Sequence, residues 1–298
     1  MFLSLMIIKN IFLFVASIIK LFIFVICFLT NSNADETNFK QYSNDEGILS
    51  IMYHRFNENK YPSTNIRMEI FLEHIKLIRE LNYEIIDANN FQENFQIAKK
   101  QKKILLTIDD GFQSFYEFAW PYLKKNKIPF ILFVSTEPIG NNGYMNWEQI
   151  KEIEKENFAT IGHHSHSHEY LIEKTNQEFV DDIEKANAIF KKELGYVPKL
   201  FSYPFGEYSE YMRNYISNNF AFAFGQHSGV IDLNKEKYQL PRFPINENYG
   251  ELKRFKSIIK TYPLEYKNFI PLEKKINNQN NPPNFKVEFF DGQKNIKI

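Results

Sequence analysis

The sequence contains very little cysteine and no excess of charge of either sign, and both absences exclude classes of protein. Cys27 is the only cysteine in 298 residues, which excludes a disulfide framework and a zinc finger built on cysteine. Lysine plus arginine and aspartate plus glutamate both number 36, so the net charge is zero. Without a basic patch, no nucleic-acid partner is expected. The 44% hydrophobic and 16% aromatic content excludes a disordered chain.

A long apolar run near the N-terminus predicts export. Residues 11–30 read IFLFVASIIKLFIFVICFLT, with Lys20 as the only charge, and mostly polar residues follow. We interpret residues 1–34 as a secretory signal peptide cleaved after Ala34, with an uncleaved membrane anchor through residues 11–30 as the alternative. The body of the protein is then secreted or periplasmic, or held at a membrane. It has 34 basic and 36 acidic residues, a net charge of −2, and no thiol.

After a linker over residues 35–46, short apolar runs alternate with segments of helical periodicity. Candidate strands cover residues 48–53, 83–86, 103–108, 130–134, 158–161, 200–203 and 220–224, and candidate helices cover residues 68–81, 112–125, 147–156, 177–194 and 209–217. This alternation predicts an α/β fold with a mostly parallel sheet. Because no glycine-rich phosphate loop follows the first strand, we expect a barrel rather than a nucleotide-binding open sheet. The chemistry of such barrels lies where strands end.

The predicted α/β domain covers residues 47–270. We assign residues 271–298 to a C-terminal extension, with a linker-like stretch over 277–284 and a possible strand over 285–290.

Two adjacent acidic residues follow one of the candidate strands. Asp109 and Asp110 come directly after Ile108, at the end of an apolar run. Two carboxylates this close raise one another's pKa unless a cation lies between them. A bound metal ion would remove the conflict. The alternative is a helix N-cap, in which one of these aspartates accepts from the first N–H groups of the following helix.

Four of the seven histidines cluster after another candidate strand, at His163, His164, His166 and His168. His164 and His168 are four residues apart, which places both imidazoles on one face if the segment is helical. The alternative is a histidine-rich surface segment without function. Because an aspartate and two imidazoles at the ends of separate strands suit a metal ion, we predict a metal site here. His163 and His166 would then support the ligands or pack against them.

These motifs together resemble the polysaccharide deacetylase family, also known as the NodB-homology group or carbohydrate esterase family 4. Thr107–Gly111 is similar to the first motif of the family, His164–His168 to its second and Ser202–Gly206 to its third. The likeness covers roughly residues 47–250. It implies a distorted (β/α)7-type barrel and a substrate that is an N-acetylated polysaccharide.

The resemblance also implies a role for each acidic and histidine residue. It implies a divalent metal held by Asp110, His164 and His168, with Asp109 as general base. Zinc is the default metal for these ligands, and Co²⁺, Ni²⁺ or Fe²⁺ also suit them. The chemistry agrees, since a metal with an open position supplies a nucleophile at neutral pH and polarises the acetyl carbonyl.

The third motif is expected to contact the substrate. Pro204 has a fixed φ and would hold the N–H of Phe205 toward the developing oxyanion, next to Tyr203. Taken alone, this segment would be an ordinary turn. Ser202 stands where the wider family has an arginine that orients the base. We predict that Arg242 replaces that arginine and belongs to the substrate-binding residues, with a surface or structural arginine as the alternative.

A leaving amine needs a proton donor, and His54 is the predicted general acid. It lies at the end of the first candidate strand, where barrel strands converge on one mouth. An early acid histidine resembles the PgaB and IcaB branch of poly-N-acetylglucosamine deacetylases, in which the order of the motifs is permuted. The alternative is a buried histidine bonded to a neighbouring strand.

The sequence therefore predicts a metal-dependent hydrolase that removes N-acetyl groups from an exported N-acetylated polysaccharide and releases acetate. Two alternatives remain open. One is a carbohydrate-binding protein that kept the fold and lost catalysis, which the serine at position 202 suggests. The other is an esterase of O-acetyl groups, which the same metal site would serve.

Overall fold

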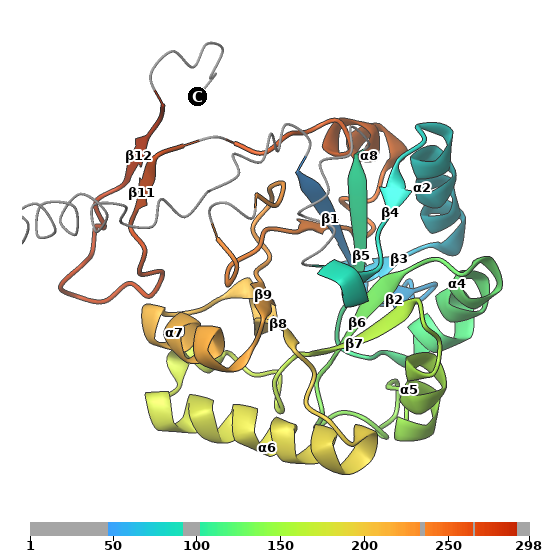
Figure 1. Cartoon of the computed structure of the whole chain (residues 1–298), viewed down its shortest axis with the longest axis horizontal. Coiled ribbons are helices and arrows are strands. Elements are labelled where there is room, and N and C mark those ends of the chain that lie inside the picture. The colour runs from blue at the N-terminus through green and yellow to red at the C-terminus, as the bar shows by residue number, and fades with distance from the viewer. Residues whose placement is uncertain (1–46, 92–101, 233–235, 265, 291–298) are drawn as a thin grey trace, which may run out of the picture. The chain divides into compact units, whose positions relative to one another are not determined.

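The computed structural model describes residues 47–91, 102–232, 236–264 and 266–290 (Figure 1). The predicted signal peptide or anchor over residues 1–34 and the linker over 35–46 lie outside the described residues. Within the described ranges, no helix is both long and apolar enough to cross a membrane.

A parallel sheet of eight strands forms the centre of the domain. Its strands are β1 (Ile48–Tyr53), β4 (Glu84–Ile85), β5 (Lys103–Ile108), β6 (Phe130–Val134), β7 (Ala159–His163), β8 (Leu200–Ser202), β9 (Phe222–Phe224) and β10 (Phe243–Pro244). The spatial order is β10-β1-β5-β6-β7-β8-β9, and β4 also pairs with β5. Every pairing in this sheet is parallel. A separate parallel pair joins β2 (Arg55–Phe56) to β3 (Asn65–Ile66).

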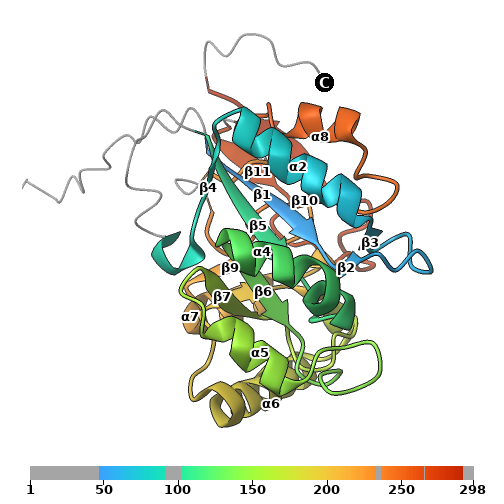
Figure 2. The same ribbon diagram turned by 90° about the vertical axis from the view of Figure 1, so that its right-hand side faces the viewer.

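Helices surround this sheet, as Figures 1 and 2 show from two sides. The α-helices are α2 (Met68–Glu80), α4 (Trp120–Asn126), α5 (Trp147–Glu154), α6 (Asn176–Leu194), α7 (Glu210–Asn219) and α8 (Leu252–Ile258). The shorter turns are η1 (Ala88–Asn90), η2 (Phe115–Ala119), η3 (Leu171–Glu173) and η4 (Pro204–Gly206). The longest helix, α6, begins at a capping box between Thr175 and Glu178 and ends at Gly195, which has φ 84°. Both signals can be identified in the sequence.

The central strands are buried on both faces. All six residues of β1, all six of β5 and all five of β6 are buried. This explains why these strands read as continuous apolar runs rather than as alternating patterns. The predicted bounds of all three strands are confirmed.

The sheet curls into a half-barrel, and one short segment links its two edges. On one side, the N–H of Leu240 donates to Ala223 O beside β9 at 2.8 Å. On the other side, the N–H of Ile245 donates to Met52 O of β1 at 2.9 Å. The predicted distorted α/β barrel is confirmed in this curled form. Arg242 lies within this linking segment, which runs from β9 to β10 beside β1.

The predicted helix over 112–125 is confirmed from Gln113 onward, but its α-helical geometry is interrupted. Residues Phe115–Ala119 form a π-helical turn, and α4 continues the helix from Trp120. Pro121 in the first turn of α4 has no N–H to donate, so the regular i→i−4 bond is missing at this junction.

The predicted boundary at residue 270 divides a pair of strands. β11 (Asn268–Ile270) pairs antiparallel with β12 (Lys286–Glu288). The strand expected within 285–290 is therefore present, and its partner lies at the end of the segment that we assigned to the barrel domain.

Candidate metal and catalytic site

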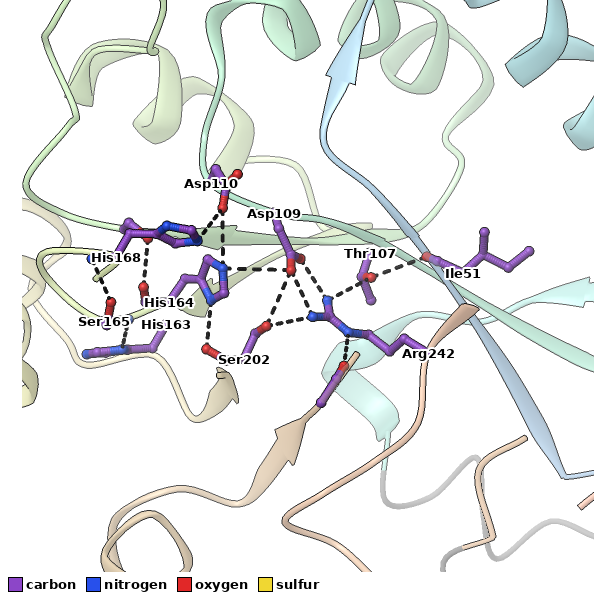
Figure 3. Close-up of polar contacts among 12 residues, drawn as sticks. Ile51, Thr107, Asp109, Asp110, His163, His164, Ser165, His168, Ser202 and Arg242 are labelled. Atoms are coloured by element: carbon purple, nitrogen blue, oxygen red, sulfur yellow. Dashed lines mark hydrogen bonds and ion pairs between the residues drawn. The ribbon is translucent and has the colours of Figure 1, made fainter. Parts of the chain in front are cut away.

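The polar residues singled out in the sequence gather at the carboxyl ends of neighbouring strands (Figure 3). Asp109 and Asp110 follow β5, His164 follows β7, and Ser202 is the last residue of β8. His54 follows β1, next to β5 in the sheet. Parallel strands bring these ends to one edge, which explains how residues about 150 positions apart share one site.

Asp110, His164 and His168 form a compact group of possible metal ligands. Asp110 Oδ1 lies 3.3 Å from His164 Nε2 and 3.1 Å from His168 Nε2. One ligand atom of each residue lies within 4.8 Å of the others. Among the residues that the structure describes, this is the one such group of three histidine, cysteine, aspartate or glutamate side chains. One carboxylate and two imidazoles match the donor set of catalytic zinc sites.

The atoms of this group fit a cation because two of them are buried without a hydrogen-bond partner. Asp110 Oδ1 and His164 Nε2 both lack a partner among the described residues. The opposite ring nitrogen of His164, Nδ1, donates to Ser202 O at 2.7 Å. This bond holds the proton on Nδ1 and turns the lone pair of Nε2 toward Asp110. Two acceptors that face each other in a buried site repel unless a cation lies between them.

The histidine segment reaches this geometry without the helical turn that we expected. Residues 164–170 are not helical, and Ser165 and His168 have positive φ values of 67° and 55°. The Asp182 carboxylate of α6 accepts from the N–H groups of His166 and Ser167 at 2.8 and 2.9 Å. Ser165 Oγ accepts from the N–H of His168 at 3.2 Å. These bonds bend the loop so that His168 returns toward His164.

The two other histidines of the segment do not face the aspartates. His163 is fully buried among Phe190, Phe201 and Phe220, and its Nδ1 accepts from the Ser165 N–H at 3.1 Å. Burial lowers the pKa of His163 to about 3, so its ring is neutral. His166 Nδ1 lies 2.7 Å from Thr136 Oγ1.

Asp109 is held by a two-point ion pair with Arg242. Arg242 Nη1 donates to Asp109 Oδ1 at 2.7 Å, and Nη2 donates to Oδ2 at 2.8 Å. Both side chains are fully buried. Arg242 also donates to Thr107 Oγ1, Ser202 Oγ and Gly225 O at 3.2, 2.8 and 2.8 Å. The planar guanidinium therefore fixes the plane of the carboxylate.

Arg242 makes these contacts as a positioning residue. Because the Arg242 side chain has no exposed surface, the prediction that it contacts the substrate directly is wrong. The predicted place of Arg242 beside Asp109 agrees with the structure.

The surrounding charges keep both aspartates ionised. Burial alone would raise the pKa of Asp109, but the charge and the hydrogen bonds of Arg242 outweigh burial and lower it. Burial acts in the same direction on Asp110, but the imidazoles of His164 and His168 close to its carboxylate hold its pKa well below the usual range.

His54 lies beside this group, partly exposed, with its Nδ1 buried and without a partner among the described residues. Burial lowers the pKa of His54, against the opposing effect of the charges of Asp110 and Asp109. The ring is therefore neutral at pH 7 and must take up a proton before it can act as an acid.

Of Tyr203, Pro204 and Phe205 in the third motif, Phe205 is the residue whose ring lies beside the site. Tyr203 is fully buried and packs its ring against Phe201 and Tyr208. The prediction that Tyr203 contacts the substrate is therefore wrong for its ring, because the apolar cluster around β8 and α7 encloses the ring. Pro204 is buried as well. Phe205 has φ 58° and its ring lies 4.8 Å from that of His168.

Two further residues, Asp182 and Thr107, help to shape this site and were not predicted from the sequence. Asp182 shapes the histidine loop from α6, and Thr107 Oγ1 accepts from Arg242 while donating to Ile51 O at 3.2 Å. Thr107 belongs to the first motif, but nothing in this mostly apolar run indicates that its hydroxyl has a specific partner. No pattern in the sequence connects Asp182 to a loop 16 residues earlier.

The comparisons with known proteins agree with this geometry. Residues 96–220 match the family model described as polysaccharide deacetylase. The Bacillus subtilis protein YxkH, also named as a polysaccharide deacetylase, is 26% identical over 162 residues, 54% of this chain and 57% of YxkH. This match therefore spans little more than half of that relative. The poly-beta-1,6-N-acetyl-D-glucosamine N-deacetylase of Staphylococcus aureus is 21% identical over 74% of this chain and 86% of its own length.

Solved structures show the same fold. IcaB from Ammonifex degensii aligns with a TM-score of 0.65 at 23% identity, over 72% of this chain and 98% of IcaB. The deacetylase PplD of Streptococcus pyogenes aligns with a TM-score of 0.65 at 18% identity, over 73% of this chain and all of PplD (100%).

Proposed function

We propose that this protein, whose residues 96–220 match the polysaccharide deacetylase family model, removes N-acetyl groups from an exported polysaccharide of the N-acetylglucosamine type. The proposed reaction depends on a divalent metal and releases acetate. The Staphylococcus aureus relative is named for poly-beta-1,6-N-acetyl-D-glucosamine, which supports this class of substrate. The apolar run over residues 11–30 supports export.

One observation carries the proposal. Three ligand atoms converge in a buried site, and a second carboxylate, held by a buried arginine, lies beside them. Asp109 Oδ2 of this second carboxylate lies 3.8 Å from His164 Nε2 of the ligand group. A ligand group with a separate, oriented base suits hydrolysis and has no use in a protein that only binds sugars.

Asp110, His164 and His168 would hold the metal ion, with zinc the first choice for this donor set. A bound divalent ion supplies an acidified water and polarises the acetyl carbonyl.

The side chains of this protein handle the protons of the reaction. Asp109 takes one proton from the attacking water as the new C–O bond forms. The N–H of Phe205 donates to the carbonyl oxygen as it gains negative charge. His54, once protonated, gives a proton to the nitrogen as the C–N bond breaks. The C–N bond breaks to give acetic acid and the free amine. The acid loses its proton to the amine or to solvent and leaves as acetate, and the proton on Asp109 returns to His54.

Acetate release from N-acetylglucosamine oligomers tests this function. The full-length protein with Zn²⁺ is expected to release acetate, and Asp109→Asn is expected to lower the rate by roughly 10²- to 10⁴-fold. Asp109→Asn should still bind Zn²⁺, because Asp109 is not one of the three ligands. Asp181→Asn is the matched control, since Asp181 lies exposed on α6 and bonds only to Gln177 among the described residues.

Other outcomes select the alternatives. Undiminished release by Asp109→Asn would show that Asp109 is not the base. Binding of the oligomers without release by the wild type would favour a sugar-binding protein. Faster release from O-acetylated than from N-acetylated oligomers would favour an esterase.

A further inference from the structure

A cluster of aromatic and charged residues lies directly beside the metal and catalytic site, on the side of β1 and β5. Its members are Arg55, Glu58, Tyr61, Phe112 and Tyr144. Arg55 is next to His54 in the chain, and Phe112 is two residues after Asp110. The N–H of Met145 donates to Gly111 O at 2.9 Å, which holds Tyr144 beside the loop that carries Asp110.

The centre of the cluster is the guanidinium of Arg55. Its Cζ lies 3.4 Å from the centroid of the Phe112 ring and 4.1 Å from that of Tyr61. Phe112 contacts Tyr144 in turn, with ring centroids 4.9 Å apart. Cation–π contacts of this kind fix the plane of an arginine without using its hydrogen-bond donors.

Most of the polar atoms in this cluster have no partner within the protein. Among the described residues, the side chain of Arg55 makes one hydrogen bond, from Nη1 to Glu58 Oε2 at 2.9 Å. Glu58 Oε1 accepts no bond there. The Arg55 and Glu58 side chains are 13% and 27% exposed. A guanidinium with free donors beside a carboxylate with a free acceptor offers both halves of what a sugar hydroxyl needs.

The backbone holds this surface in place before any ligand binds. Asn65 Oδ1 accepts from the N–H of Glu58 at 2.7 Å, and the N–H of Tyr61 donates to Glu58 O at 2.9 Å. On the other wall, the N–H of Gln113 donates to Gly143 O at 2.9 Å, beside a bridge between Phe112 and Tyr144. Tyr61 is 39% exposed, so part of its ring is open to a ligand.

We propose that Arg55, Glu58 and Tyr61, supported by Phe112 and Tyr144, form a binding subsite for a neutral pyranose next to the sugar whose acetyl group is removed. The Arg55–Glu58 pair has no net charge, which suits an uncharged sugar better than a carboxylate or a phosphate. The exposed Tyr61 ring supplies an apolar face for the C–H groups of the sugar. This subsite makes the protein prefer polymer over monomer, and it rests on the proposed function.

Binding to the full-length protein before metal is added tests the subsite without hydrolysis. Isothermal titration would compare N-acetylglucosamine with its β-1,6-linked pentamer for the wild type, Tyr61→Ala and Arg55→Lys. We expect each variant to weaken pentamer affinity by roughly 5- to 10-fold relative to monomer affinity. Arg55→Lys keeps the charge and loses the planar donors. Tyr262→Ala is the matched control, because Tyr262 is 60% exposed under Lys102 at the opposite end of β5.

The same proteins with Zn²⁺ separate the two proposals. The KM for the pentamer is expected to rise by a similar factor in Tyr61→Ala, with a smaller change in kcat. An unchanged ratio of pentamer to monomer affinity in both variants would overturn the subsite while acetate release by the wild type still supported the function. A wild type that releases no acetate but prefers the pentamer would overturn the function alone. A wild type that binds neither sugar would overturn both.

Discussion

At the scale of single residues, the pairing of Asp109 with Arg242 decides the chemistry of the site. A buried carboxylate without a counter-charge would take up a proton and lose its use as a base. Here the arginine comes from the segment that links the two edges of the sheet. It donates to both carboxylate oxygens. Ser202 takes part in this arrangement, because its Oγ accepts a hydrogen bond from the same guanidinium.

Removing Arg242 is expected to destabilise the fold as well as the base. Arg242→Met leaves the Asp109 charge buried and unpaired, so the free energy of unfolding should fall by about 3–5 kcal/mol. The double variant Asp109→Asn/Arg242→Met should be more stable than Arg242→Met alone. Urea denaturation measures all three. Arg67→Met is the control, because Arg67 is 48% exposed and its ion pairs lie at the surface. It should lower the free energy of unfolding by less than about 1 kcal/mol. A double variant no more stable than Arg242→Met would contradict this account.

His74 predicts a pH-dependent stability away from the site. Its Nδ1 accepts from Tyr53 OH at 3.0 Å, and its Nε2 donates to Gly250 O at 2.7 Å. Burial lowers the pKa of His74 to about 4. Between pH 6.5 and 4, the unfolded chain binds a proton that the folded chain does not, so stability falls as the pH falls.

The comparison of wild type with His74→Gln isolates this effect. The stability advantage of the wild type at pH 7 should shrink by up to about 3 kcal/mol at pH 4. Urea denaturation at several pH values measures it. A constant difference between the two proteins over this range would rule out His74 as the titrating group.

At the scale of elements, β7 places the histidine ligands, and its fit against β6 depends on one glycine. Gly162 lies in the strand two residues before His164, and a Cβ added there would overlap the ring of Phe133. The register pairs Phe133 with Gly162 and Val134 with His163. A displacement of β7 therefore moves the ligand that follows it.

Gly162→Ala is expected to lower both stability and metal affinity. Overpacking of this kind costs about 1–3 kcal/mol, and the shift should weaken Zn²⁺ binding measured by competition with a chelating dye. Gly195→Ala is the control, because Gly195 has φ 84° and open space around its Cβ position. It should cost about 1 kcal/mol and leave Zn²⁺ affinity unchanged. Equal Zn²⁺ affinity in Gly162→Ala and the wild type would show that β7 tolerates the side chain.

At the scale of the whole molecule, the metal site joins two parts of the chain that are distant in sequence. Asp110 comes from the loop after β5, while His164 and His168 come from the loop after β7. A cation bound by both loops binds the folded chain more tightly than the unfolded chain, so it stabilises the fold as a whole.

Zinc is therefore expected to raise the thermal midpoint of the metal-free protein. At a free concentration of 100 Kd, the gain is about 2.7 kcal/mol, and differential scanning calorimetry measures it. His164→Ala should abolish the gain. His166→Ala is the control, because His166 lies in the same loop and its ring faces Thr136; the gain should persist there. Loss of the gain in both variants would show that zinc binds elsewhere.

The sequence by itself determined most of the central strands and helices and the order of the chemical residues, while β10 and α8 were not predicted. Buried runs such as Lys103–Ile108 can be read directly, because a strand covered on both faces is mostly apolar. The aspartate pair and the histidine cluster follow such runs, so the parallel fold alone predicts that they meet.

Only the tertiary structure decided which atoms face one another. The bend of the histidine loop depends on Asp182 from α6, and the orientation of Asp109 depends on Arg242 from the other end of the domain. The burial of Tyr203 and the exposure of Tyr61 also depend on packing between distant segments. The physical reason is that local periodicity determines which face of an element is apolar, whereas contacts across the fold determine what each polar atom finds as its partner.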